Sequence, residues 1–375
     1  MPPKIWAMNM SELHALQAQV LWAAFAVALA FGWIAQRSHF CTMGALSDIV
    51  NMGDWTRMRM WGMAIGVAMI GFWGMAAAGL INPERAVFSS QRLFWLSSLV
   101  GGLLFGFGMV LASGCASKTL VRLGAGSLKS LVVFAVMGLS AFATLRGFAA
   151  DVRNHSVDLM HIDTVNVSSL MPSWLAYAFK AELAHVGMLI SLVAGGALVL
   201  WALWSTDFRA SWDNLLGGFG IGLLAVAMWW VSGHLGFVAE HPETMDAVYL
   251  VGSGGRFTAL SFTAPLARTL DWLITSAPLT LGVVLVGGVV LGAWVQALAS
   301  GSFHWEGFHG TQDTALHLGG AVCMGVGGIT AGGCTIGQGL SGISTLSVLS
   351  LITVTGILIG GVSGLRFQLW LVMRD

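Results

Sequence analysis

The stretch TALHLGGAVCMGVGGITAGGCTIGQGLSGISTLSVLSLITVTGILIGGVSGL, residues 314–365, contains no Asp, Glu, Lys or Arg. A helix needs about 20 mostly apolar residues to cross the hydrocarbon core of a bilayer. The stretch is therefore long enough for two crossings and a turn between them. It predicts a chain that lies in a membrane.

The composition of the whole chain supports this prediction. Of its 375 residues, 56% are hydrophobic and 9% are charged, and the mean hydropathy is +0.80. Because a soluble domain usually carries about 25% charged residues, the 17 basic and 17 acidic side chains are too few to cover a soluble surface of this size. They are enough for the loops of a membrane protein. The net charge of zero argues against nucleic acid as a partner, since no basic stripe is available to neutralise phosphates.

Uncharged windows of membrane-crossing length occur about nine times. They cover roughly 19–36, 61–81, 94–112, 130–145, 183–204, 214–233, 278–299, 314–331 and 345–365. We therefore predict an all-α polytopic membrane protein with about nine transmembrane helices in the lipid bilayer. The segment before the first window contains Glu12 and is not clearly basic, so we expect a retained first helix rather than a cleaved signal peptide.

An internal repeat accompanies these windows. GFGMVLASGC (106–115) aligns with GVGGITAGGC (325–334), with a Cys at the same offset; chance similarity between glycine-rich segments is the alternative. The longest polar segment, 150–173, lies between the two blocks. We predict a single membrane domain, 1–375, with a first half-repeat at 19–149, an inter-repeat loop at 150–173 and a second half-repeat at 174–375. Such repeats commonly form a transporter core with the substrate site between the halves.

Each repeated block favours an interrupted helix. An apolar segment ends at small residues and a Cys, and a new helical run follows. We expect broken or re-entrant helices that meet at the centre of the protein. The start of a helix carries free backbone N–H groups and a positive dipole end, so it attracts an anion without any charged side chain.

The cysteines in these positions are the candidate substrate-path residues. Cys115 and Cys334 occupy the repeated position, and Cys41 follows His39 at the end of the first window, whereas Cys323 lies inside an apolar run and reads as a packing residue. A neutral thiol donates a weak hydrogen bond to an anion, while a thiolate repels it. The residues predicted to support the path are His39, Gly114, Ser117, Lys118, Gly333, Thr335 and Gln338. We predict no metal site, because no CxxC pair occurs. We also predict no cofactor and no catalytic residue, since no general base is paired with a Cys apart from His39 near Cys41.

Three segments carry a resemblance to a known family. QRSHFCTMGALSD (36–48), GFGMVLASGCASKTLVRLGAGSLKSLVV (106–133) and GVGGITAGGCTIGQGLSG (325–342) resemble signature segments of the YeeE/YedE family of bacterial membrane proteins, which is associated with sulfur transport. The resemblance runs from about residue 20 to the C-terminus. It implies an hourglass-like fold of two pseudo-symmetric halves and a path lined by three cysteines, which match Cys41, Cys115 and Cys334.

The same resemblance implies a function. Members similar to YeeE take up thiosulfate through the bacterial inner (cytoplasmic) membrane without an enzymatic reaction, and the genes of such proteins often lie beside small TusA-like or rhodanese-like cytoplasmic sulfur carriers. The YedE branch is linked to selenium metabolism, so transport of a selenium compound is one alternative. From the residues alone, a sulfur-transfer protein that uses a Cys persulfide and an ion channel with incidental cysteines stay open.

Overall fold

The computed structural model describes residues 10–374 apart from 166, 243–244, 253–254, 277 and 309. Within these residues, nine helical segments are long and apolar enough to cross a membrane. They are Met10–Met52, Thr56–Ala77, Trp95–Gly124, Leu128–Arg146, Leu183–Leu203, Trp212–Leu235, Leu281–Ala299, Thr311–Gly342 and Val348–Arg374. Each window expected from the sequence falls on one of them, so the chain is a multi-pass all-α membrane protein.

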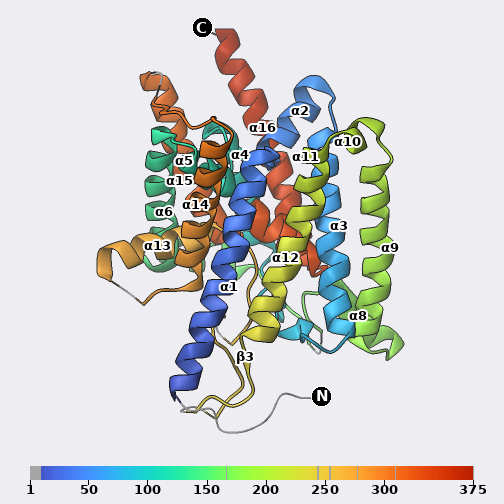
Figure 1. The fold of residues 1–375 in the computed structure, drawn as a ribbon. Coiled ribbons are helices and arrows are strands. Elements are labelled where there is room, and N and C mark those ends of the chain that lie inside the picture. The colour runs from blue at the N-terminus through green and yellow to red at the C-terminus, as the bar shows by residue number, and fades with distance from the viewer. Residues whose placement is uncertain are drawn as a thin grey trace.

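Long helices are interspersed with shorter ones along the chain (Figure 1). The long helices are α1 (Met10–Arg37), α3 (Thr56–Ala77), α4 (Trp95–Leu111), α6 (Leu128–Arg146), α9 (Leu183–Leu203), α14 (Leu281–Ala299), α15 (Thr311–Thr330) and α16 (Val348–Arg374), and α12 (Ile221–Trp230) is the central part of the longer helical segment Trp212–Leu235. The shorter ones are α2 (Thr42–Met52), α5 (Ala116–Gly124), α7 (Phe148–Asn154), α8 (Met171–Phe179), α10 (Thr206–Ala210), α11 (Trp212–Leu215) and α13 (Thr263–Thr275). Three π-helical segments are η3 (Leu216–Gly220), η4 (Val231–Leu235) and η5 (Thr335–Gly342).

The remaining regular elements are short and lie outside the helical segments that could cross a membrane. The 3₁₀ turns are η1 (Pro83–Arg85) and η2 (Val157–Leu159). Strand β1 (Arg92–Leu93) pairs antiparallel with β2 (Ile162–Asp163), and β3 (Phe237–Val238) pairs antiparallel with β4 (Val248–Tyr249). The polar segment 150–173 therefore carries short elements of its own, and β2 ties it to the start of α4.

Glycines let the central helices approach closely. A Cβ atom on Gly106 of α4 would lie 2.1 Å from the carbonyl oxygen of Ile357 in α16. Gly101 of α4 and Gly327 of α15 face each other, since a Cβ on either would lie 2.7 Å from the carbonyl oxygen of the other. Only small residues permit such contacts, and in lipid this close packing is what holds helices together. Helix α4 is thereby packed against both α15 and α16.

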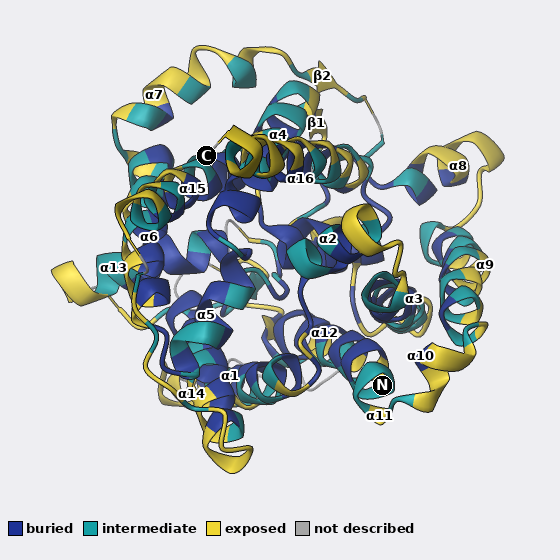
Figure 2. Ribbon diagram, turned by 90° about the horizontal axis from the view of Figure 1, so that it is seen from above, coloured by how far each residue is buried: buried dark blue, intermediate teal, exposed yellow. Residues whose placement is uncertain are grey.

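The core surrounds the short helices at the centre of the molecule. Seen from above, buried segments lie in the middle and exposed ones at the rim (Figure 2). Helix α2 lies toward the end of the molecule that carries the C-terminus, and α13 projects at the side (Figure 1). The largest buried cluster includes Cys115 and Cys334 among its apolar side chains.

Candidate functional site

Two helices are interrupted at the repeated Gly-Cys blocks. Helix α4 ends at Leu111 and α5 begins at Ala116, while α15 ends at Thr330 and η5 begins at Thr335. The interruptions expected from the sequence are therefore present. Each places a new helix start inside a segment that crosses the membrane.

Both interruptions have the same backbone geometry. Ser113 and Gly332 each lie two residues before a Cys and adopt left-handed conformations, with φ of 56° and 71°. The N–H groups of Gly114 and Gly333 each donate to the carbonyl five residues earlier, at 2.8 Å. This is the Schellman pattern that satisfies the last carbonyls of a helix. It turns the chain so that the following Cys begins the next helix.

The three predicted path cysteines are all N-cap residues. Cys41 precedes α2, Cys115 precedes α5 and Cys334 precedes η5, with side chains exposed by 6%, 1% and 0%. The Cys41 sulfur accepts a hydrogen bond from the Gly44 N–H at 3.4 Å, and the Cys334 sulfur accepts one from the Gly337 N–H at the same distance. Each thiol therefore lies at the positive end of a helix.

Cys115 joins the first interrupted helix to the second. Its thiol lies beside the thiol of Cys41. Its sulfur lies 3.2 Å from the hydroxyl oxygen of Ser117. The hydroxyl of Thr335, the first residue of η5, lies beside the same sulfur. The structure thus brings together Cys41, Cys115, Ser117 and Thr335 from three elements.

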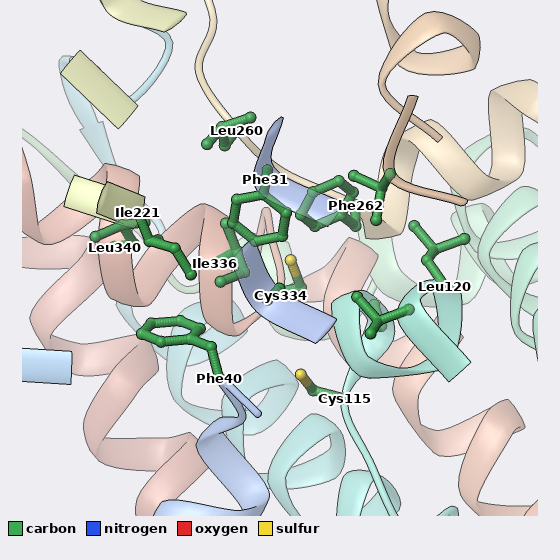
Figure 3. Close-up of a cluster of buried hydrophobic side chains, with 14 of the residues drawn as sticks. Phe31, Phe40, Cys115, Leu120, Ile221, Leu260, Phe262, Cys334, Ile336 and Leu340 are labelled. Carbon is green, nitrogen blue, oxygen red and sulfur yellow. The ribbon is translucent and has the colours of Figure 1, made fainter. Parts of the chain in front are cut away.

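Cys334 is buried among apolar side chains in the same cluster as Cys115. Figure 3 shows Cys115 and Cys334 in one cluster with the rings of Phe31 and Phe262. The backbone N–H of Phe262, the N-cap residue of α13, interacts with the Cys334 sulfur. A fourth helix start thereby contributes to the site. The sequence analysis did not name Phe262, because a backbone donor leaves no side-chain signal.

Cys323 lies apart from this cluster of path thiols. It is half-buried in the middle of α15, and a Cβ atom on Gly108 of α4 would lie 2.8 Å from its Cβ. It packs the two helices together and caps no helix. This agrees with the packing role expected for it.

Basic side chains lie on the side of the site that faces α2 and α3. Lys118 of α5 is half-buried, within electrostatic reach of Cys41, Cys115, Arg57 and Arg122. Among the residues that the structure describes, no acidic side chain forms an ion pair with Lys118. The sequence analysis did not name Arg57. Its position shortly after the segment that contains Cys41 could have indicated a basic residue near the path.

His39 lies at the edge of this basic region. It adopts a left-handed conformation, with φ of 52°, in the turn between α1 and α2, and its side chain is exposed. Lys118, Arg57 and Asp213 are its charged neighbours. The structure therefore brings His39 to the mouth of the site rather than into contact with the thiols.

Gln338 occupies the place in the second half that Lys118 has in the first. A Cβ on Gly114 would lie 3.0 Å from Cγ of Lys118, and one on Gly333 would lie 3.2 Å from Cγ of Gln338. The Gln338 amide donates to the Ala331 carbonyl at 2.9 Å, and its side-chain oxygen accepts from the hydroxyl of Ser350. The two ends of the site therefore differ in charge, with a cation at one and a neutral amide at the other.

Two cavities reach the second interruption from the side of the molecule that carries β1 and β2. One has a volume of about 290 Å³ and the other about 220 Å³, and both include Val87, Phe88 and Gly332 in their walls. Gln338 also lines the larger one. Small solutes can therefore approach within two residues of Cys334 from this side.

Ion pairs hold the outer end of α5 in place. Glu306, in the loop between α14 and α15, pairs with Arg122 of α5 at 3.1 Å and with the buried Lys129 of α6. Its carbonyl also accepts the N–H of Leu128 at 2.8 Å. Burial raises the pKa of the Glu306 carboxyl, but hydrogen bonds and charges from Lys129 and Arg122 outweigh this and lower the pKa to about 2.

Acid should therefore destabilise the protein through Glu306. Because its folded pKa lies below the ordinary value, its stabilising contribution is present above about pH 4.5 and is lost as the pH falls toward about 2. We expect the melting temperature of the parent to fall between about pH 5 and pH 3. The Glu306→Gln variant should be less stable at pH 7 and lose less over the same range. Equal losses in parent and variant would contradict the assignment.

The arrangement as a whole is suited to binding an anion. Three helix starts with thiols and one backbone N–H converge in a buried cluster, and hydrogen-bond donors stabilise negative charge there without a buried carboxylate or metal. Among the described residues, no group of three or more His, Cys, Asp or Glu could hold a metal ion.

Comparison with known proteins identifies the family of the chain. A profile of the family described as Sulphur transport matches residues 37–363. The chain is 28% identical to the thiosulfate transporter TsuA of Escherichia coli (strain K12), covering 82% of this chain and 83% of that protein. It is 27% identical to the protein of the same name from Spirochaeta thermophila, covering 88% and 94%. A probable transporter YedE of Salmonella typhimurium is 29% identical over only 31% of this chain and 26% of its own length. With its interrupted helices, buried N-cap thiols and a profile match over most of its length, the chain belongs to the Sulphur transport family.

Proposed function

We propose that this protein transports thiosulfate along a path lined by Cys41, Cys115 and Cys334. The observation that carries the proposal is that each of these buried cysteines is the N-cap residue of a different helix. Cys115 and Cys334 lie in one buried cluster, and Cys41 lies beside Cys115. Two relatives named as thiosulfate transporters match more than four fifths of the chain, which supports the same substrate.

The chemistry of the path suits this anion. Thiosulfate carries two negative charges and a soft terminal sulfur. Helix starts favour the charge, and neutral S–H groups donate weak hydrogen bonds to the sulfur as it passes from one thiol to the next. Since a permanently buried charge is costly in a membrane, backbone and thiol donors are suited to line the buried part of the path around the three cysteines.

Other residues are proposed to support this passage. Ser117 and Thr335 lie beside Cys115 and supply hydroxyl donors at the point where the two halves meet. Lys118 attracts the dianion to the basic end of the path. The remaining supporting residues are His39 at the mouth, Gly114 and Gly333 at the helix interruptions, and Gln338, which holds the position in the second half that Lys118 has in the first.

We also propose that the path is built from two half-repeats, 19–149 and 174–375, with 150–173 between them. The matching left-handed residues Ser113 and Gly332 and the mutual contact of α4 with α15 support this division. Transport between two such halves is a common design of membrane transporters.

The bacterial inner membrane is the proposed location, and a small cytoplasmic sulfur carrier of the TusA-like or rhodanese-like type is the proposed partner. The thiolate of such a carrier would take the terminal sulfur of thiosulfate as a persulfide; the S–S bond of thiosulfate breaks and sulfite leaves, so thiosulfate is consumed in the cytoplasm and net uptake is favoured. The bacterial relatives named as transporters support the location.

A growth test addresses the substrate. Bacterial cells that lack other sulfate and thiosulfate uptake should grow on thiosulfate as the only sulfur source when they produce this protein. Cells with the empty vector should grow only on cysteine. Growth on cysteine alone in both strains, without accumulation of labelled thiosulfate, would contradict the proposal, and uptake of a selenium compound instead would favour that alternative.

We further propose that transport involves no enzymatic step. Protein incubated with thiosulfate should return unmodified in a mass spectrum. A lasting persulfide on Cys115 or Cys334 would instead support sulfur-transfer chemistry.

A further inference from the structure

A third cavity, of about 220 Å³, lies between α6 and α13. Its walls are formed by Phe142, Leu145 and Arg146 of α6 and by Arg268 and Asp271 of α13. Both polar and apolar surface lines it. The proposed thiosulfate path includes none of these five residues, so the cavity points to a different ligand.

The cavity lies where α6 leaves the hydrocarbon of the membrane. Helix α6 has 19 residues, and at about 1.5 Å per residue it is about as long as the hydrocarbon core is thick. Lys129 and Arg146 lie at its two ends. Arg146 is therefore placed at the level of the lipid headgroups, where a long basic side chain is favoured.

Helix α13 carries the opposite wall out to the rim of the molecule. It begins after Phe262 near the path, and its far end projects from the side (Figure 1, Figure 2). Leu273 and Ile274 at that end are 61% and 76% exposed. Exposed apolar side chains that lie together on a membrane protein mark contact with lipid. The cavity is therefore next to the part of the surface that faces the lipid.

The walls of the cavity carry an excess of positive charge. Arg146 and Arg268 share a single carboxylate, that of Asp271. The distance from Nη1 of Arg146 to Oδ2 of Asp271 is 3.8 Å, which is too long for a hydrogen bond. Within the described part of the chain the Arg146 guanidinium makes no hydrogen bond, so its N–H donors are available to a ligand. A guanidinium binds phosphate oxygens through parallel hydrogen bonds.

The apolar wall is fixed by the packing of the two helices. Phe142 and Leu145 pack against Ala141 of α6 and Ala267 of α13, and both alanines are fully buried. One water needs about 10–15 Å³ of the volume that is open to the centre of a water-sized sphere. At about 220 Å³, the cavity has room for a phosphate group with some of its water.

We propose that this cavity binds the headgroup of an anionic phospholipid such as phosphatidylglycerol. Arg146 and Arg268 hold the phosphate oxygens, while Phe142 and Leu145 contact the apolar part of the same lipid. Basic pockets between transmembrane helices bind anionic headgroups in this way. Phosphatidylethanolamine carries an ammonium group close to its phosphate, so the positive walls select against it.

Melting temperatures of the purified, delipidated full-length protein test the proposal. They are measured with phosphatidylglycerol, phosphatidylethanolamine or inorganic phosphate, and native mass spectrometry counts the lipids that stay bound. The variants are Arg146→Gln, Arg268→Gln and Asp271→Asn. Arg92→Gln is the matched control, because Arg92 is also exposed and paired with a carboxylate, that of Asp163, but lines no part of this cavity.

We expect phosphatidylglycerol to stabilise the parent more than phosphatidylethanolamine does, and inorganic phosphate at the same concentration to have little effect. Arg146→Gln and Arg268→Gln should each weaken the binding of phosphatidylglycerol about tenfold. Asp271→Asn should strengthen it, because this variant removes the negative charge from the walls. A purely structural ion pair would not give opposite results for its two partners. Arg92→Gln should bind the lipid as the parent does.

Three results would overturn the lipid site: equal stabilisation by the two lipids, equal stabilisation by inorganic phosphate, or unchanged lipid binding in Arg146→Gln. The Arg146 side chain is 70% exposed, so this variant should fold as the parent does and keep the test decisive. None of these measurements involves thiosulfate. The proposed function is therefore tested separately.

Discussion

Replacing Cys115 by Ala is expected to abolish thiosulfate uptake while the protein still folds. Cys115 is 1% exposed, and its thiol lies beside Cys41, Ser117 and Thr335. It is therefore the point at which the start of α5 contacts the neighbouring helix starts. The substitution removes only the S–H group at a helix start, so the loss of packing energy should be small. In the variant, a dehydrated anion at this point lacks the hydrogen bond from the thiol, which costs about 1–3 kcal/mol. As a barrier in a narrow path, about 1.4 kcal/mol slows passage tenfold.

The other cysteines make this result specific. Cys334→Ala should have a similar effect, and Cys41→Ala should also impair uptake, because these thiols cap the other two helices of the path. Cys323→Ala is the matched control, since this thiol only packs α15 against α4. Uptake and the amount of folded protein are measured together for all four variants. An active Cys334→Ala protein beside an inactive Cys323→Ala protein would mean that the wrong cysteine was assigned.

Serine at position 115 separates two roles of the thiol. It keeps a donor but is smaller and less polarisable than Cys. If the thiol acts as a hydrogen-bond donor, Cys115→Ser should keep more uptake than Cys115→Ala. If sulfur must be transferred covalently, the two variants should be equally inactive.

The membrane architecture could be predicted from the sequence because the bilayer itself enforces it. A backbone in lipid must satisfy its own hydrogen bonds, so an uncharged window of sufficient length can only be a helix. The ends were less predictable: α1 begins at Met10 and α16 continues to Arg374, well beyond their apolar windows. Polar residues extend a helix readily once it leaves the hydrocarbon.

The two helix interruptions were also predictable, but the geometry of the helix that follows the second interruption was not. Counting residues after each Cys aligns Lys118 with Gly337. In the structure η5 is π-helical, which adds a residue to the turn and brings Gln338 rather than Gly337 against Gly333. No local pattern in the sequence marks this change.

Reversing the charge of Lys118 is expected to have the other large effect, with Lys118→Glu abolishing thiosulfate uptake and Lys118→Gln raising KM at least tenfold. Hydrogen bonds from a charged group contribute about 1.5–3 kcal/mol, which corresponds to roughly a 10- to 150-fold change in affinity. Lys180, which is exposed near the end of α8, provides the control: Lys180→Gln should leave KM unchanged.

The stability of these variants separates an anion-binding role from a structural one. Lys129 pairs with Glu306, so Lys129→Gln leaves Glu306 without one of its two partners and should destabilise the protein. Lys118 has no acidic partner among the described residues, and a half-buried cation in that position lowers stability until an anion neutralises it. Lys118→Gln should therefore be at least as stable as the parent without thiosulfate, yet gain less stability when thiosulfate is added. A melting temperature that falls as far as that of Lys129→Gln, with KM unchanged, would mean that Lys118 holds the fold rather than the substrate.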